Sequence, residues 1–222
     1  MKSGALSALV LALCYLFGFA LLLTVMNPGN TQDMSQLERL SFLLERRGLF
    51  QLWNLVIYVV FGVVLVVLTT VLHRTLDRRD SIWMSVATPF GFIWAGLVIA
   101  SGMIASVGLE AVAERYATDP EGAAQLWSVL GVVQNGLGGG VEVVGGLWVL
   151  LLSLWSIRTG TAFPKWLDGI GLIVGTAGIL TLVPVFSGLG AVFGLTQIVW
   201  FLALAWVLVR IEGAPTWLDG HS

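Results

Sequence analysis

The sequence contains few charged side chains: Asp, Glu, Lys and Arg make up 11% of its 222 residues, against roughly a quarter in a typical soluble domain. Its hydrophobic fraction is 57%. A soluble chain of this length exposes many of its residues to water and cannot bury that much apolar surface. The scarcity of charge therefore excludes an ordinary soluble domain and favours a chain that lies in lipid.

Cysteine and histidine are also scarce. The single cysteine, Cys14, can form neither an intrachain disulfide nor a cysteine-based metal site. His73 and His221 lie outside the apolar segments, so haem ligation within a membrane and a histidine-assisted serine mechanism both lack a histidine. We therefore expect no catalytic residue, no metal and no cofactor. An enzyme with a cavity at the cytoplasmic face stays open as an alternative, with the carboxylates of Asp77, Asp80 and Asp168.

Long apolar runs are abundant. A transmembrane helix needs about 20 mostly apolar residues, and the runs of that length are 5–26, 52–72, 82–107, 126–157, 167–186 and 190–209. These runs are continuous rather than alternating, which predicts helices instead of barrel strands. The first run follows Lys2 as in a secretory signal, but its length and the lack of a clear cleavage site favour a retained helix. The fold prediction is an all-α, polytopic transmembrane bundle of six helices, with residues 1–222 as a single integral membrane domain.

The positions of Lys and Arg predict the orientation of these helices. With the N-terminus inside, the cytoplasmic segments carry seven basic residues and the outer segments carry four. The densest basic segment is the short loop at 73–79. Both termini are therefore expected in the cytoplasm. The net charge of −2 and the absence of a concentrated basic face give no reason to expect a nucleic-acid partner.

Two outer segments are expected to be helical outside the bilayer. Ser35 and Glu38 form a capping-box pattern, so residues 33–47 are either an amphipathic helix in the outer interface, ended by Gly48, or an ordinary connector. The third and fourth helices are expected to cover about 38 residues each, or ~57 Å at 1.5 Å per residue. They would then project on the outer side as a helical hairpin, about 108–126, with Asp119 and Pro120 starting its second helix. This hairpin is the predicted docking surface for a protein partner.

Glu142 is the ionisable side chain placed unambiguously inside an apolar run. It lies ~24 Å along the helix from Arg158, in the outer half of the bilayer, where a charged carboxylate costs several kcal/mol. On a continuous helix Asn135, Gly139, Glu142 and Gly146 share one face. Two interpretations stay open: a ligand, ion or proton site on this face, or a tight helix contact in which Glu142 hydrogen-bonds a neighbour.

Polar side chains on other spans are the expected neighbours of Glu142 at similar depth: Asn54, Tyr58, Ser101, Thr196 and Gln197. No basic side chain is available at that level, so a protonated Glu142 that donates a hydrogen bond is favoured over a buried ion pair. The predicted ligand-binding residues are Glu142, Asn135, Gly139, Gly146, Gln197, Tyr58 and Asn54.

A family resemblance begins at the fifth run. The segment from Ala162 to Gly171, AFPKWLDGIG, resembles the opening of the fifth helix in an uncharacterised family of bacterial six-helix integral membrane proteins, one of the domain-of-unknown-function families. The glycine-rich segment before Glu142, and Trp148 after it, resemble the same family. Asp168 departs from it, since a glycine is expected there. The resemblance implies a six-helix, multi-pass protein of the bacterial inner (plasma) membrane and implies no activity.

The favoured function is a non-enzymatic module that binds membrane lipids or a small hydrophobic ligand, or an accessory subunit of a membrane complex. The alternative is a small transporter or proton-coupled carrier that uses Glu142. The lack of an evident internal repeat and of interrupted helix pairs speaks against a carrier. An intramembrane enzyme is the least favoured function. Ligand identity and oligomeric state are not determined by these patterns.

Overall fold

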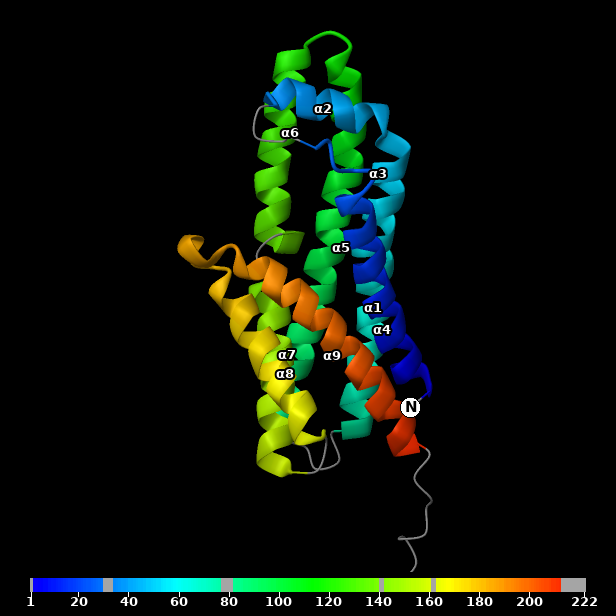
Figure 1. Ribbon diagram of the computed structural model, residues 1–222, viewed down its shortest axis with the longest axis vertical. Helices are drawn as coiled ribbons and strands as arrows, with labels where there is room; N and C mark the ends of the chain where they lie inside the picture. Colours follow the sequence, from blue (N-terminus) through cyan, green and yellow to red (C-terminus); the bar gives the residue numbers. More distant parts are fainter. Residues whose placement is uncertain (1, 30–33, 77–81, 140–141, 161–162, 213–222) are drawn as a thin grey trace, which may run out of the picture.

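The computed structural model describes residues 2–29, 34–76, 82–139, 142–160 and 163–212, which form helices and no strand (Figure 1). The all-α prediction is confirmed for this part of the chain. The elements are α1 (Lys2–Leu23), α2 (Gln36–Glu45), α3 (Arg47–Asn54), η1 (Leu55–Val60), α4 (Phe61–Leu76), α5 (Ile82–Tyr116), α6 (Pro120–Gln134), η2 (Asn135–Gly139), α7 (Val143–Thr159), α8 (Lys165–Leu180), η3 (Pro184–Phe186) and α9 (Leu189–Glu212). Of the η elements, η1 and η2 are π-helical and η3 is a 3-10 turn.

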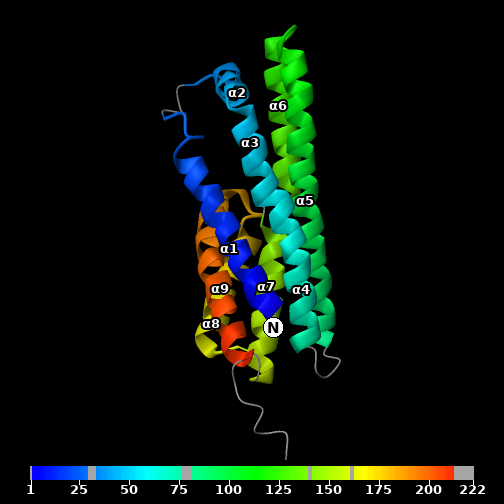
Figure 2. The same ribbon diagram turned by 90° about the vertical axis from the view of Figure 1, so that its right-hand side faces the viewer.

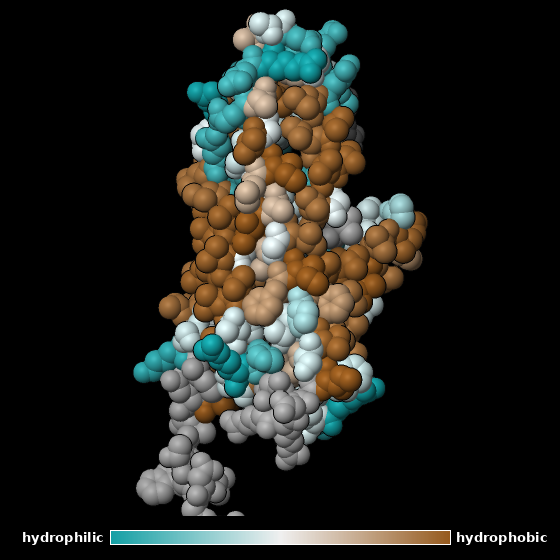
Figure 3. Space-filling view, turned by 180° about the vertical axis from the view of Figure 1, so that it is seen from behind, coloured by the Kyte–Doolittle hydropathy of each residue, from teal (hydrophilic) through white to brown (hydrophobic). Residues whose placement is uncertain are grey.

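Five helical segments in the described residues are long and apolar enough to cross a membrane: α1, α3 to α4, α5, α6 to α7, and α9. On the face seen in Figure 3, a broad apolar band covers the middle of the molecule and polar side chains gather at both ends. Lipid-facing helices require this distribution, because apolar side chains favour the hydrocarbon and charged ones favour water. These five long apolar helices and this distribution of side chains support a transmembrane helical bundle.

The fifth predicted run, 167–186, forms a shorter helix than expected. Helix α8 has 16 residues and ends at Leu180, followed by a turn and by η3. Pro184 is a local cause of this end, because it disfavours helical backbone at Val183, which is extended. At the same end of α8, the Thr181 hydroxyl donates to the Gly178 carbonyl oxygen at 2.6 Å.

The helices alternate in direction, so the N-terminal end of α1 and the C-terminal end of α9 lie at the same end of the bundle (Figure 1). At mid-bundle, tryptophans from three helices form a buried aromatic core. Ring centroids are 5.8 Å apart for Trp94 on α5 and Trp148 on α7, and 5.8 Å apart for Trp148 and Trp200 on α9. This core packs α5, α7 and α9 against one another. It lies below the end of the bundle that carries α2.

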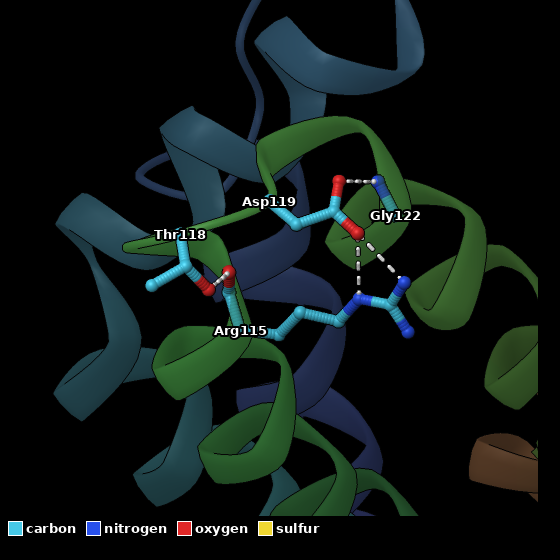
Figure 4. A network of polar contacts seen from close by, with 4 residues as sticks. All are labelled: Arg115, Thr118, Asp119 and Gly122. Carbon is cyan, nitrogen blue, oxygen red and sulfur yellow. Dashed lines mark hydrogen bonds and ion pairs between the residues drawn. The ribbon is translucent and has the colours of Figure 1, made fainter.

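Helices α5 and α6 run side by side and extend well beyond α8 and α9 (Figure 2). At their turn, Asp119 caps α6: its Oδ1 accepts a hydrogen bond from the Gly122 backbone N–H at 2.9 Å, and its Oδ2 pairs with the Arg115 guanidinium at 2.7 Å (Figure 4). The predicted start of α6 at Asp119 and Pro120 is confirmed. Helix α2 packs across this hairpin through Leu40, which is buried against α5 and α6.

The capping box that starts α2 is also confirmed. The Ser35 backbone N–H donates to Glu38 Oε2 at 2.7 Å, and the Glu38 backbone N–H donates to Ser35 Oγ at 3.2 Å. The expected end at Gly48 is wrong, because the backbone leaves the helical region at Arg46 and Gly48 lies inside α3. Of the predicted segment 33–47, residue 33 lies outside the described residues.

The fourth predicted helix is not continuous. Helix α6 ends at Gln134, η2 follows with Gly138 at φ 127°, and α7 starts at Val143 with Glu142 as its N-cap residue. Successive glycines at 138–140 explain the break, because glycine is a poor helix former and adopts positive φ without a steric penalty. The expected unbroken helix is therefore wrong, and so is the shared face of Asn135, Gly139, Glu142 and Gly146 that depended on it.

Candidate functional site

A cavity of about 230 Å³ lies between α1, the segment from α3 through α4, α5 and the break between α6 and α7. Aromatic side chains dominate its lining, and one carboxylate reaches it, that of Glu142. Leu22, at the C-terminal end of α1, also lines it and is 46% exposed. The aromatic residues are Tyr15, Phe19, Trp53, Tyr58, Phe61 and Trp94; the other lining residues are Cys14, Gly18, Ile57, Val98 and Gly138.

The backbone of Glu142 is fixed by α8. Its N–H donates to the Thr181 hydroxyl oxygen at 2.9 Å, and its carbonyl oxygen accepts from the Gly146 N–H at 2.8 Å, closing the first turn of α7. The Thr181 hydroxyl in turn donates to the Gly178 carbonyl oxygen. The glycine-rich break therefore ends at Glu142, whose backbone is hydrogen-bonded to α8. This bond fixes the position from which the Glu142 side chain extends.

The Glu142 side chain is partly accessible and lines the cavity. Within the described residues, no side chain donates a hydrogen bond to its carboxylate and no Lys, Arg or His forms an ion pair with it. The hydroxyl-bearing rings of Tyr15 and Tyr58 lie within electrostatic range of it. The packing alternative for Glu142 was a hydrogen bond to a neighbouring side chain, and no such bond is present among the described residues.

Tyr58 reaches the cavity from a π-helical turn. Elements η1 and η2 are both π-helical, and such turns insert an extra residue and occur frequently at functional sites. A Cβ atom placed on Gly102 of α5 would lie 2.6 Å from the Tyr58 Cβ, so the helices touch closely at this level.

The aromatic rings meet at steep angles along the cavity wall. Tyr15 and Phe61 have ring centroids 5.3 Å apart and planes at 87°; Phe61 and Trp94 are 5.5 Å apart at 70°. Trp53 and Tyr58 are 6.1 Å apart at 85°. The Trp53 indole N–H donates to the Gly18 carbonyl oxygen at 3.0 Å, which ties α3 to α1. These contacts make the wall a packed aromatic shell rather than a set of independent side chains.

Of the predicted ligand-binding residues, the structure brings Glu142 and Tyr58 together at the cavity. The others do not line it. Asn54 joins α3 to α5, donating from Nδ2 to the Gly102 carbonyl oxygen at 2.7 Å and to Ser106 Oγ at 2.6 Å. Asn135 is exposed, and Gly139 lies in η2.

Gly146 and Gln197 lie in helix packing. A Cβ atom on Gly146 would lie 2.8 Å from the Gly175 carbonyl oxygen, so this glycine admits α8 rather than a ligand. Gln197 is fully buried on α9, and neither atom of its amide has a hydrogen-bond partner in the described part of the chain. The expected neighbours Ser101 and Thr196 bond to carbonyl oxygens, those of Gln134 and Val192 respectively.

Sequence reasoning missed the residues that α1, α4 and α5 contribute, including Tyr15, Phe61 and Trp94. Helix α1 is apolar on every side, so no periodicity in its sequence distinguishes the cavity face from the lipid face. Tyr15 could have indicated the cavity face, because its hydroxyl lies inside an apolar run and such a hydroxyl usually has a polar partner nearby.

The described lining of this cavity is mostly aromatic and apolar. The described lining residues include no histidine and no serine, and the described part of the chain holds no group of three or more His, Cys, Asp or Glu side chains placed to bind a metal. An apolar cavity with few polar groups is the usual form of a small-molecule site. Comparison of the chain with protein-family models, with curated proteins and with solved structures found no match.

Proposed function

We propose that the chain spans the membrane six times, with α8 and the residues up to Phe186 as the fifth span and both ends in the cytoplasm. The C-terminal end of α9 lies beside the N-terminal end of α1, which supports an even number of crossings. Lys2, Arg74, Arg158, Lys165 and Arg210 lie towards that end, and the sequence adds Arg78 and Arg79 in the segment 77–81. The positive-inside rule assigns this end to the cytoplasm. A C-terminal fluorescent-protein fusion should therefore be bright, and a C-terminal alkaline phosphatase fusion inactive.

The proposed function is the binding of a small hydrophobic or lipid-like ligand in the aromatic cavity, with the Glu142 carboxyl as its polar contact. One observation carries this proposal: the cavity combines six aromatic side chains with a carboxylate that has no partner among the described residues. A carboxyl group inside the membrane that is neither paired nor hydrogen-bonded is costly, and intramembrane ionisable residues mark sites of function. A ligand that contacts this group would recover part of that cost.

A cavity-filling substitution tests this function. Val98 lines the cavity and is 4% exposed, so Val98→Trp should occupy the ligand volume. Val107→Trp is the matched control, because Val107 lies on the same helix and is 72% exposed. Native mass spectrometry of protein released from lipid nanodiscs should report a co-purified small molecule on the parent protein and on Val107→Trp, and its loss on Val98→Trp. Equal occupancy of all three proteins would refute binding in this cavity.

The second candidate function is proton-coupled transport through Glu142. The observation in its favour is the break between α6 and α7, since transporter sites are commonly built where a transmembrane helix is interrupted. Glu142 is the N-cap residue of α7, the second of the two helices that the break separates, and it lines the cavity. In proteoliposomes with a pH gradient, transport predicts ligand-dependent proton uptake that Glu142→Gln abolishes. Ligand binding without proton uptake would refute transport and would support only the binding function.

The accessory-subunit role and the family resemblance stay predictions. The hairpin of α5 and α6 presents exposed acidic residues near its turn, Glu114, Asp119 and Glu121. A partner that docks there would need a basic surface. Affinity purification of the full chain, compared with a variant in which these three residues are replaced by Gln, Asn and Gln, tests this role. The bacterial inner membrane location follows from the resemblance of the segment from Ala162 to Gly171.

A further inference from the structure

We propose that the cavity ligand is a small organic cation, an ammonium group carried on a short apolar body. This inference deepens the ligand-binding function proposed above and rests on it. It names the chemical class that the cavity selects, and it follows from the rings, the charge balance and the volume of the cavity together.

The rings supply the first argument. Tyr15, Phe61 and Trp94 form a connected series of near-perpendicular rings, and Trp53 and Tyr58 form another such pair. The negative face of an aromatic ring attracts a cation, and several rings around one volume form the cage that recognises alkylated ammonium groups. A purely aliphatic lining would suit a neutral hydrocarbon equally well. Here the aromatic residues outnumber the aliphatic ones, which are Leu22, Ile57 and Val98.

The charge balance supplies the second argument. The described lining residues include one carboxylate and no Lys, Arg or His. The carboxylate belongs to the N-cap residue of α7, where the positive end of the helix dipole favours a negative charge. An ionised carboxylate without a counter-ion is costly in a bilayer. A cationic ligand supplies that counter-ion, whereas a neutral ligand does not.

The volume supplies the third argument. A cavity of about 230 Å³ is roughly seven to eight times the ~30 Å³ share of one water molecule in the liquid, so it holds a body of roughly ten heavy atoms. A whole phospholipid does not fit.

The experiment compares benzyltrimethylammonium with its uncharged carbon isostere, neopentylbenzene. Each compound is equilibrated by dialysis with lipid nanodiscs that contain the full chain, and empty nanodiscs of the same lipid subtract partitioning. The proposal predicts saturable binding of the cation, at least tenfold tighter than that of the isostere. Glu142→Gln should weaken cation binding at least tenfold. Glu114→Gln, which removes an exposed carboxylate outside the cavity, should leave it unchanged.

A second pair of variants separates ring recognition from simple burial. Tyr15→Phe keeps the aromatic face and should retain most cation binding, whereas Tyr15→Leu should lose several-fold. Neither change should alter binding of the isostere by a comparable factor. These two Tyr15 variants still test the proposal if Glu142→Gln does not yield folded protein.

Three outcomes would overturn the proposal. Equal binding of both compounds, insensitive to Glu142→Gln, would remove the cation preference while the cavity remained a hydrophobic site. Cation binding that survives Glu142→Gln and Tyr15→Leu would place the cation elsewhere. Absence of binding by the cation would reject the ligand class. The proposed function is judged separately by occupancy of the Val98→Trp variant.

Discussion

Gly146 on α7 lies in backbone contact with Gly178 on α8. A Cβ atom placed on Gly146 would lie 3.0 Å from the Gly178 Cα atom and 2.8 Å from the Gly175 carbonyl oxygen. Small residues on both helices allow this approach, which is a common way to pack helices in lipid. The contact lies one turn below Glu142, so it positions the start of α7 and with it the carboxylate of the site.

Replacing Gly146 should therefore destabilise the fold. Gly146→Ala forces the two backbones apart, and overpacking of this kind costs about 1–3 kcal/mol. Gly96→Ala is the control, since a Cβ atom on that α5 glycine would meet no atom within 4 Å. Ala is a better helix former than Gly, so this control should be neutral or slightly stabilising. Reversible unfolding in mixed detergent micelles measures both changes. Equal effects of the two substitutions would refute the close packing of α7 on α8.

The hydrogen bond from the Glu142 N–H to the Thr181 hydroxyl gives a second prediction. Thr181→Val leaves this buried N–H without an acceptor, at a cost of about 1–3 kcal/mol. Thr176→Val, at an exposed position on the same helix, should change stability by less than about 0.5 kcal/mol. Hydrogen exchange at the Glu142 amide should accelerate in Thr181→Val alone. Unchanged exchange in that variant would show that α8 does not fix the start of α7.

Two carboxyl groups at the end of the molecule that carries α2 should titrate below their ordinary ranges. The backbone hydrogen bond from Ser35, followed by its side-chain hydrogen bond, lowers the pKa of Glu38 from 4.5. The side-chain hydrogen bond from Arg115, followed by the backbone hydrogen bond from Gly122, lowers the pKa of Asp119 from 3.8. Because each pKa is lower in the folded state, each cap stabilises fully above the ordinary value. That stabilisation is lost as the pH falls through the lowered pKa.

Carboxyl chemical shifts of Glu38 and Asp119, followed by NMR between pH 6 and pH 2 in micelles, measure these midpoints. Asp119→Asn is the control for the hairpin, because asparagine caps a helix well but carries no charge. Protection of the Gly122 amide should fall with pH in the parent protein and stay nearly constant in Asp119→Asn. A midpoint for Asp119 at or above 3.8 would contradict the ion pair with Arg115.

Cys14 provides a reporter of cavity occupancy, because it lines the cavity and is the single cysteine of the chain. Its side chain is 4% exposed, so a small thiol reagent such as methyl methanethiosulfonate should label it slowly, and more slowly when a ligand fills the cavity. Mass spectrometry of the intact protein gives the rate. The same reagent on Cys14→Ala, Val107→Cys supplies the control, since position 107 is exposed and is not among the lining residues of the cavity. Ligand protection at both positions would indicate a general change rather than occupancy.

The helices themselves could be predicted because their signals are local. The apolar runs, the capping box at Ser35 and the start of α6 at Asp119 each depend on residues a few positions apart. The early end of α8 and the break before Glu142 could not be placed from apolar content alone. Gly138 reads equally well as a packing residue or as a position with positive φ, and the choice depends on how α7 meets α8.

The site was predicted in part, for a related reason. Glu142 was found because a carboxylate in an apolar run is costly wherever its helix packs. Tyr58 was predicted because its expected depth in the bilayer is similar to that of Glu142. Phe61 and Trp94 could not be assigned, since aromatic residues in apolar runs pack in the core or face lipid with equal ease. Their convergence on one cavity is a property of the tertiary packing.

The central claim is that the Glu142 carboxyl contacts a ligand bound in the aromatic cavity. A crystal structure of the protein in a lipidic mesophase tests this claim most directly. The account predicts density for a small molecule between Tyr15, Tyr58 and the Glu142 carboxylate, with the N–H of Glu142 still bonded to Thr181. A structure in which the cavity is closed by side chains and the Glu142 carboxylate bonds a protein donor would contradict it. Glu142 would then be a packing residue of the bundle.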